Sequence, residues 1–530
     1  MALPMVTETT STHAGDDVAA FERLKPQLLD LWQRLEREPA RAHTSIVVPS
    51  LSVNQEELAK VPGAAFYEER LLFTLMRLRS PGARLIYLTS QPIHPETVDY
   101  YLQLLVGVPA SRAKQRLLLL CVQDDSPRPL TEKILERPKV IERLREWIGD
   151  PREAYITCFN STALERRLAL ELDAPLYSTD PKLNWLGTKS GCRKTFREAG
   201  VALAEGFEDL RSESDIIEAL AALRERRPEL STAVVKLNDG FSGEGNAIFR
   251  YPAEGSTDGH ALLRALHQLE WSHENETYAA FIRKFGEMGG IVEEFVQGRD
   301  THSPSAQMRI LPDGGVRLVS THDQVVGGAT GQVYLGCRFP AHPDYRQLVQ
   351  SEAHKIGDAL SSYGVVGRFA IDFLVFRDAN DEWECRAVEI NLRMGGTTPP
   401  FMALEMLGRG SFDPDRGGYI SAGGREKFYY ATDNLHSPAY RGLLPEDLID
   451  ILTKYGIRFD PATETGVLFF MIGALSQYGK LGIVSIGNSR DEADELYQRT
   501  VAILDKESGA EAAAGGHLHP LFVHGHASIE

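Results

Sequence analysis

The fold of this chain is decided by one stretch, Ala387-Val388-Glu389-Ile390-Asn391-Leu392-Arg393-Met394-Gly395-Gly396. Glu389, Asn391 and Arg393 alternate in it with apolar residues, and side chains two positions apart in a strand lie on the same face. A carboxylate and an amide oxygen are hard ligands that suit Mg²⁺, whereas an arginine suits a phosphate or a carboxylate. A solvent-exposed strand of alternating polarity is the simpler interpretation of this pattern taken alone.

A second predicted strand, residues 367–376, contains a lone acid, Asp372, within an apolar run. A buried carboxylate needs a partner. An antiparallel pair joined by the polar turn 377–382 would place Asp372 beside Glu389 and Asn391. Because adjacent carboxylates repel unless a cation lies between them, Asp372, Glu389 and Asn391 are predicted to form a magnesium site.

Composition limits the class of protein. The chain has 530 residues, of which 43% are hydrophobic and 25% charged, and its net charge is -17. The length predicts several domains, and the acidic balance argues against a nucleic-acid-binding protein. Five scattered cysteines form no C-x-x-C pair, which favours a reducing cytoplasmic compartment. No secretion signal or bilayer-spanning run is recognised, so we expect no membrane partner.

Residues 45–179 are predicted to form an α/β domain. Apolar residues from Phe21 to Leu35 recur at helical spacing and predict one packing helix. Short apolar runs at 45–48, 84–89, 116–122, 154–159 and 175–178 then alternate with helical stretches at 66–78, 96–105, 138–147 and 163–171. This alternation predicts a parallel sheet with helices on its faces. No Gly-x-Gly-x-x-Gly follows the first run, so an NAD site is weakly supported.

Two further segments carry candidate nucleotide ligands. Lys236 lies near the end of an apolar strand, and the loop after it contains Ser242, Gly243 and Gly245. The amides of such a loop can fold over phosphates, but a bulged hairpin would use the same residues. In the second segment, residues 289–300, the run Glu293-Glu294-Phe295-Val296 can offer backbone groups to a base edge and a ring to its face. Asp300 follows a glycine turn and could accept hydrogen bonds from a ribose, although an edge strand and a turn would look the same.

Taken in order, these pieces resemble the ATP-grasp superfamily. They are Lys189, Lys236 with its glycine loop, the Glu293 segment with Asp300, Asp372, and Glu389-x-Asn391-x-Arg393. The flanking segments, including 327–338, 465–475 and 479–483, resemble peptide ligases of the pheganomycin type. The resemblance implies an N-terminal extension with one helix (1–43), a Rossmann-like pre-ATP-grasp domain (44–180), an ATP-grasp domain (181–415), a small α+β C-terminal domain (416–508) and a disordered tail (509–530).

The resemblance also implies roles. Lys189 and Lys236 would hold ATP phosphates, and the glycine loop would cover them. Glu293 would take the adenine amino group, the backbone of Val296 would face the ring, and Asp300 would bind the ribose. Asp300 departs from the glutamate usual at that position. Arg393 would face the transferred phosphate or the acyl substrate, while Arg309 and Arg368 are candidate donors to a substrate carboxylate or oxyanion, with an ordinary salt bridge as the alternative.

These roles predict an ATP- and Mg²⁺-dependent carboxylate–amine ligase that forms an acyl phosphate and releases ADP and phosphate. Its expected partners are small-molecule carboxylates and amines, such as amino acids or short peptides. Phosphoryl transfer to a non-carboxylate and a non-catalytic nucleotide-binding scaffold are the alternatives. The sequence specifies neither the two substrates nor the oligomeric state, for which a homodimer is one option.

Overall fold

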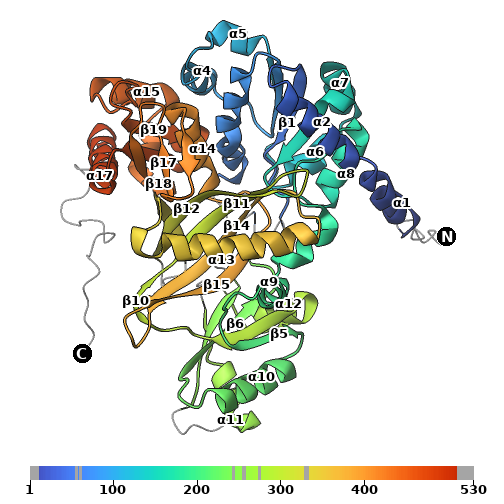
Figure 1. The fold of residues 1–530 in the computed structure, drawn as a ribbon, viewed down its shortest axis with the longest axis vertical. Coiled ribbons are helices and arrows are strands. Elements are labelled where there is room, and N and C mark those ends of the chain that lie inside the picture. The colour runs from blue at the N-terminus through green and yellow to red at the C-terminus, as the bar shows by residue number, and fades with distance from the viewer. Residues whose placement is uncertain are drawn as a thin grey trace, which may run out of the picture.

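The computed structural model describes residues 11–53, 58, 63–240, 245–252, 258–271, 276–327 and 333–509. Within these residues the strands form three sheets of four, five and eleven strands, each flanked by helices (Figure 1). No helix in these ranges combines the length and apolar composition needed to cross a bilayer. The mixed α/β and α+β architecture predicted from the sequence is confirmed.

The N-terminal unit is a parallel sheet in the order β3-β2-β1-β4, as its alternating pattern predicts. The run at 175–178 contributes only an isolated bridge, Ile156 to Leu176. The helix expected at 66–78 is present as a long 3₁₀ helix, η1. The elements are β1 (His43–Val48), η1 (Ala64–Arg79), β2 (Ala83–Thr89), α4 (Pro95–Gln103), α5 (Ala110–Lys114), β3 (Leu117–Cys121), α6 (Leu130–Leu135), α7 (Pro138–Ile148), η2 (Pro151–Glu153), β4 (Ala154–Cys158) and α8 (Ala163–Leu172).

The single N-terminal helix predicted from the sequence is divided in two, α1 (Ser11–Glu22) and α2 (Lys25–Arg37). Pro26 stands in the first turn of α2. Proline has no backbone N–H to continue a preceding helix, but it is well suited to a first turn. The helix therefore restarts at this point, and both parts keep the apolar spacing that buries Phe21, Leu24, Leu28 and Leu31.

The five-stranded sheet lies in a small lobe (green in Figure 1) with strand order β5-β9-β6-β7-β8. Helices α10 and α12 pack their buried residues onto this sheet to form a separate hydrophobic core. The elements are η3 (Pro181–Gly187), α9 (Lys189–Glu198), β5 (Gly206–Leu210), α10 (Glu213–Arg226), β6 (Thr232–Leu237), β7 (Asn246–Arg250), α11 (Gly259–Leu266), β8 (Glu270–Trp271), α12 (Tyr278–Met288) and β9 (Gly290–Glu294).

The eleven-stranded sheet is the centre of the molecule, and α13 lies across one of its faces (Figure 1). Its main path is β10-β14-β11-β12-β13-β18-β17-β16, with β15 beside β14 and β20 beside β18 and β19. The elements are β10 (Arg299–His302), β11 (Pro304–Ile310), β12 (Val316–Gly327), β13 (Val333–Phe339), α13 (Pro343–Ser362), β14 (Gly367–Arg377), β15 (Trp383–Asn391), α14 (Thr398–Gly408), β16 (Ser411–Asp413) and β17 (Gly418–Ile420).

The C-terminal strands extend this central sheet, because β18 pairs with β13. β19 pairs with β20, and a short helical connection joins the end of β19 at Phe470 to the start of β20. The boundary at 416 therefore stays a prediction. The elements are β18 (Glu426–His436), η4 (Pro438–Gly442), α15 (Pro445–Lys454), β19 (Gly466–Phe470), η5 (Ile472–Ala474), α16 (Leu475–Tyr478), β20 (Lys480–Gly487) and α17 (Arg490–Glu507).

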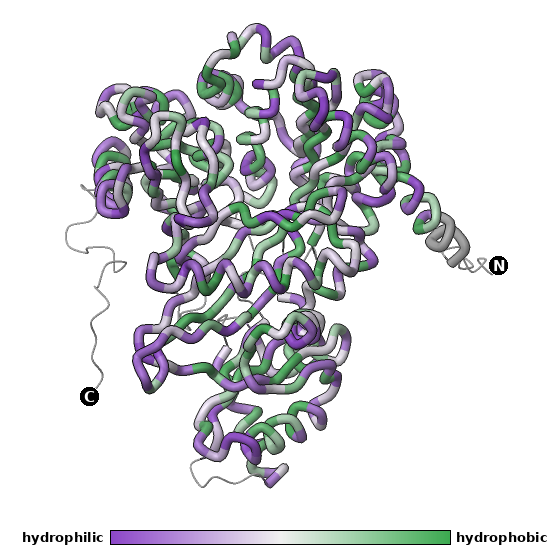
Figure 2. Tube along the Cα trace, viewed as in Figure 1, coloured by the Kyte–Doolittle hydropathy of each residue, from purple (hydrophilic) through white to green (hydrophobic). Residues whose placement is uncertain are grey.

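Hydrophobic segments concentrate in the interior strands (Figure 2). One core cluster joins the N-terminal unit to the C-terminal strands: Phe73 of η1 contacts Tyr101 at 5.1 Å and Phe470 of β19 at 6.0 Å between ring centroids. Burial of large aromatic side chains is strongly stabilising. This shared core holds η1 against β18–β20.

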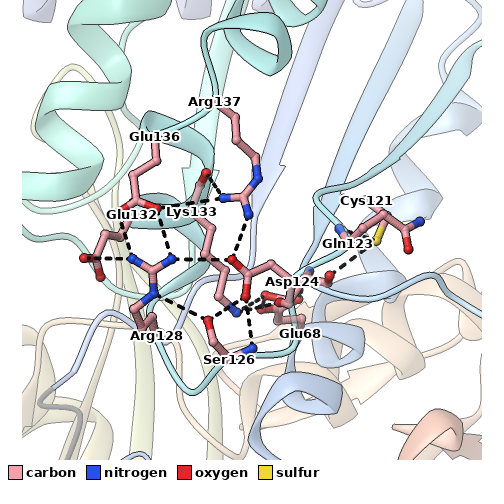
Figure 3. A network of polar contacts seen from close by, with 11 residues as sticks. Glu68, Cys121, Gln123, Asp124, Ser126, Arg128, Glu132, Lys133, Glu136 and Arg137 are labelled. Atoms are coloured by element: carbon pink, nitrogen blue, oxygen red, sulfur yellow. Dashed lines mark hydrogen bonds and ion pairs between the residues drawn. The ribbon is translucent and has the colours of Figure 1, made fainter.

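A polar network closes one end of the parallel sheet (Figure 3). Lys133 of α6 donates to Ser90 Oγ at 3.0 Å and to the backbone oxygen of Asp124 at 2.8 Å, and Glu68 accepts from the Ser90 hydroxyl at 2.7 Å. Burial raises the pKa of Glu68 to about 7 despite these bonds. Buried polar groups that find partners in this way stabilise a fold, and we assign this network a structural role.

Candidate active site

A cleft of about 1120 Å³ opens between the small lobe and the central sheet and extends to the N-terminal unit and to β18 and β20. The first and the last of the predicted residues in its walls, Lys189 and Arg393, are 204 positions apart in the sequence. The predicted residues that line it are Lys189, Lys236, Glu293, Glu294, Phe295, Val296, Asp372, Glu389, Asn391 and Arg393.

Lys189 is the first residue of α9. The Thr188 hydroxyl caps this helix by accepting from the Gly191 N–H at 3.0 Å. A Cβ at Gly191 would lie 1.9 Å from the backbone oxygen of Trp185, so the turn requires glycine there. Lys189 Nζ lies 2.5 Å from Glu389 Oε1. The helix start thus places a buried ammonium group beside the acid of β15.

Lys236 is the polar residue near the end of β6, and its Nζ lies 2.5 Å from Glu293 Oε1 of the neighbouring strand β9. Glu293 Oε2 also accepts from Arg193 Nη1 at 3.0 Å. Burial alone would raise the pKa of Glu293, but attraction to Lys236 and Arg193 outweighs it and the net shift is downward. Glu293 is therefore an ionised carboxylate held between two cations.

The loop after Lys236 connects the antiparallel strands β6 and β7. The segment is therefore a hairpin, which is the alternative considered for its sequence. Asn238, its first residue, accepts from the Lys189 and Ser190 N–H groups at 3.0 Å each, so the loop is tied to the start of α9. Gly245 adopts φ +80°. Ser242 and Gly243 lie outside the described residues, and the phosphate role of the loop stays a prediction.

Both carboxylate oxygens of Glu294 accept hydrogen bonds from other parts of the small lobe. Its Oε2 accepts from Arg227 Nη1 at 2.9 Å, and its Oε1 accepts from the Glu205 N–H at 2.9 Å. The N–H of Phe295 donates to the Thr232 oxygen at 3.3 Å. These bonds hold the segment that leads to Val296 along the cleft wall.

The predicted antiparallel pair is confirmed: β14 pairs with β15, and Asp372 lies opposite Glu389. The register shifts immediately after this pair, between Asp372 and Phe373. Gln324 Nε2 donates to Asp372 Oδ1 at 2.9 Å, and Asn391 Nδ2 donates to Asp372 Oδ2 at 3.0 Å. A bulge of this kind re-aims side chains, and here it accompanies a cluster of oxygen-bearing groups.

Burial and repulsion by Glu389 raise the pKa of Asp372 to about 6. Burial also acts to raise the pKa of Glu389, but the adjacent Lys189 outweighs it, so the pKa of Glu389 is lowered. Two facing carboxylates of this kind favour a cation between them. No cluster of three or more His, Cys, Asp or Glu residues with metal-binding geometry occurs in the described part of the chain. The set of two carboxylates and one amide is nevertheless made of the hard oxygen donors that Mg²⁺ prefers.

Arg393 does not continue the strand, contrary to the prediction that it shares a strand face with Glu389 and Asn391. β15 ends at Asn391, and the Arg393 N–H donates to the Asn391 oxygen at 2.8 Å. The next residue, Met394, donates its N–H to the Phe159 oxygen at 3.0 Å. The chain leaves the sheet because its backbone bonds to the N-terminal unit, and Arg393 still lines the cleft.

Comparison with known proteins identifies the family. The chain is 31% identical over 473 residues to L-propargylglycine–L-glutamate ligase of Streptantibioticus cattleyicolor, covering 87% of this chain and 94% of that protein. The family model described as IQCH-like ATP-grasp matches residues 182–251 and 257–415, and that of the PGM1 C-terminal domain matches 447–500. The chain belongs to the ATP-grasp ligase family.

A more distant protein and a solved structure are also similar to this chain. IQ motif-containing protein H of Danio rerio is 23% identical over 417 residues, which are 70% of this chain and 39% of that protein. The crystal structure of a biotin carboxylase–β-γ-ATP complex from Campylobacter jejuni matches the fold with a TM-score of 0.51 at 12% identity. It covers 86% of this chain and 90% of that one.

Four predicted residues that the structure describes do not line the cleft: Gly245, Asp300, Arg309 and Arg368. Arg368 Nη2 instead lies 3.8 Å from Glu405 Oε2, which matches the salt-bridge alternative. Arg309 lies opposite Arg368 in the β11–β14 register, away from the cleft. Asp300 has φ +53° and pairs with His302 Nε2 at 3.0 Å. Its predicted ribose contact stays untested.

Several cleft residues of the ATP-grasp ligase escaped the sequence analysis. They include Gln324, which bonds Asp372, and a second group from distant segments: Tyr67, Arg70, Phe159, Asp433 and Lys480. Lys480 follows a glycine in a segment that resembles the family, but nothing near it predicted a cleft position. These residues meet only because η1, β18 and β20 share a hydrophobic core.

Proposed function

We propose that this chain joins a carboxylate to an amine in an ATP- and Mg²⁺-dependent reaction through an acyl phosphate, with amino acids or short peptides as substrates. One observation carries the proposal: two lysines, an arginine and the facing acids Asp372 and Glu389 line a single cleft. The relative named above is a ligase whose name specifies two amino acids.

In this proposal Lys189 and Lys236 bind the phosphates of ATP. Each ammonium group is held by an acid, Glu389 and Glu293 respectively, at 2.5 Å. A positioned cation needs little reorganisation when a phosphate arrives, so it stabilises developing charge effectively. The side chains of Asp372, Glu389 and Asn391 would hold Mg²⁺, which supplies charge neutralisation at the phosphates when bound.

The reaction has two steps. A carboxylate oxygen of the first substrate attacks the γ-phosphorus, the bond to the β-phosphate oxygen breaks, and ADP leaves. The amine of the second substrate then attacks the acyl carbon, loses a proton, and releases phosphate. No side-chain nucleophile is required, so the contribution of the chain is to position the reactants and neutralise charge. Arg393 would donate to the transferred phosphoryl group or to the acyl oxygen.

The test is a screen of amino acids and short peptides, in pairs, for ATP-dependent product formation followed by mass spectrometry. ADP and phosphate should appear only when both substrates are present. With a donor labelled by ¹⁸O in its carboxylate, one labelled oxygen should appear in the released phosphate, because the acyl phosphate loses that oxygen with the phosphoryl group. Formation of AMP and pyrophosphate, phosphorylation of a non-carboxylate, or nucleotide binding without any turnover would contradict the proposal.

A further inference from the structure

Beyond Arg393 the cleft continues into a region that no role described so far uses. Five residues form it, and we call it the Arg70 subsite: Tyr67, Arg70, Phe159, Asp433 and Lys480. They come from η1, the segment after β4, β18 and β20. The pairing of β18 with β20 shifts register between Thr432 and Leu435, so Asp433 lies within a bulge that turns it toward the cleft.

The Arg70 guanidinium lies over two aromatic rings. Its central carbon lies 4.5 Å from the ring centroid of Tyr67 and 4.4 Å from that of Phe159. Two aromatic faces at this distance fix the plane of a guanidinium by cation–π attraction. The N–H donors lie at the edge of this planar group, where its hydrogen bonds are made.

The N–H donors at this edge are only partly hydrogen-bonded. Arg70 Nε donates to the backbone oxygen of Tyr67 at 3.3 Å, and Nη1 lies 3.6 Å from Asp433 Oδ2. Nη2 is buried and has no hydrogen-bond partner among the described residues, while the side chain as a whole is 5% exposed. An unsatisfied buried donor of a charged group is costly. Its presence at a cleft wall therefore points to a ligand that completes it.

The charges of the subsite favour an anion. Lys480 Nζ donates to the Tyr67 hydroxyl at 2.5 Å. Burial lowers the pKa of both Arg70 and Lys480, and repulsion between the two cations adds to the decrease in Lys480, while Asp433 opposes it. Two cations face one carboxylate, so the subsite carries one unit of uncompensated positive charge. A single carboxylate balances this charge, whereas a phosphate dianion exceeds it.

We propose that the Arg70 subsite binds the non-reacting carboxylate of an amino-acid or peptide substrate, through Arg70 Nη2 with Lys480 as the second cation. The inference rests on the proposed function, because it assigns a place to one of the two ligase substrates. Asp433 is a positioning residue: it holds Nη1 and so directs Nη2. The planar guanidinium fork matches the plane of a carboxylate, a geometry that a lysine ammonium cannot reproduce.

Binding measurements test the subsite, and turnover tests the proposed function separately. Calorimetry on the full chain with Mg²⁺ and ADP uses L-glutamate and its two monoamides, L-glutamine and L-isoglutamine, as probes. We expect wild type to bind L-glutamate and to lose about 10- to 100-fold in affinity when one of the carboxylates becomes an amide, as for a hydrogen bond between charged groups. Arg70→Met should show the same loss for L-glutamate and no further loss with the one amide that weakens binding to wild type. Arg70→Lys should recover only part of the affinity.

The matched control is Arg338→Met. Arg338 also combines an ion pair, to Asp494 at 3.0 Å, with an aromatic contact, to Tyr430 at 5.1 Å, but it does not line the cleft. It should bind the probes as wild type does. Equal affinity of Arg70→Met and wild type for L-glutamate, or no binding of any probe by wild type, would overturn the inference. Loss of binding in Arg70→Met without any ligation by wild type would contradict the proposed function and leave the subsite standing.

Discussion

Asp372 lies directly opposite Glu389 in the antiparallel pair of β14 and β15. Burial, with repulsion by Glu389 added to it, raises the pKa of Asp372 from 3.8 to about 6. Lys189 already offsets the charge of Glu389, so a further cation would chiefly stabilise the ionised form of Asp372. This pair of acids is therefore the clearest point at which structure and proposed chemistry can be tested together.

The first prediction concerns pH. Because the pKa of Asp372 is higher in the folded chain than in the unfolded one, ionising it destabilises the fold. This destabilisation is absent below about pH 4 and grows as the pH rises through about 6. Asp372→Asn in metal-free buffer should therefore gain thermal stability relative to wild type between pH 4 and pH 7. The diagnostic observation is how the stability difference between Asp372→Asn and wild type changes with pH. Loss of the hydrogen bonds from Gln324 and Asn391 would alter that difference by the same amount at every pH. A pH-independent difference would contradict the raised pKa of Asp372.

The second prediction separates nucleotide binding from folding. Lys236→Met should weaken ATP binding by about tenfold or more, because it removes a cation held at the cleft wall. The fold should persist, since Glu293 keeps its bond from Arg193. Lys454→Met is the matched control: Lys454 pairs with Glu507 at 2.7 Å and is largely exposed. Titration calorimetry with ATP compares the two, and equal affinities would rule out the phosphate role of Lys236.

The third prediction separates chemistry from nucleotide binding at Arg393. Arg393→Lys should bind Mg·ATP almost normally but form product about a hundredfold to a thousandfold more slowly, by analogy with removal of one oxyanion donor. An interaction made mainly in the transition state lowers turnover without a matching change in affinity. ATP affinity and single-turnover ADP formation are measured on the same variant. Near-normal chemistry would exclude the catalytic role.

The fourth prediction concerns Arg368, which sequence analysis placed among the catalytic candidates and the structure places beside Glu405. Arg368→Met should lower the melting temperature, because Glu405, which is half-buried, would lose its cationic partner. Turnover by the folded variant should stay within about twofold of wild type, as expected for a residue that touches no reactant. Steady-state kinetics well below the melting temperature decide the matter. A large loss of turnover with unchanged stability would restore the catalytic interpretation.

Much of the candidate site could be predicted from local sequence patterns. The alternation around Glu389 and Asn391 and the lone acid Asp372 predicted a strand pair whose register the structure reproduces. Side-chain alternation in a strand and the pairing of two neighbouring strands depend on short-range geometry, so a sequence records them directly. The same reasoning predicted the parallel N-terminal sheet, since alternating strands and helices permit few arrangements.

Contacts between distant segments decided the rest. Arg393 leaves its strand because Met394 bonds to Phe159, and Arg309 and Arg368 lie away from the cleft because of how β11 and β14 pair. The sequence by itself determined the family, the sheet classes and the facing acids. Only the tertiary structure decided which cations reach the cleft and brought Arg70 to Asp433 and Lys480. The physical reason is that burial of η1 against β18–β20 depends on packing between residues about 360 to 410 positions apart, which no local periodicity encodes.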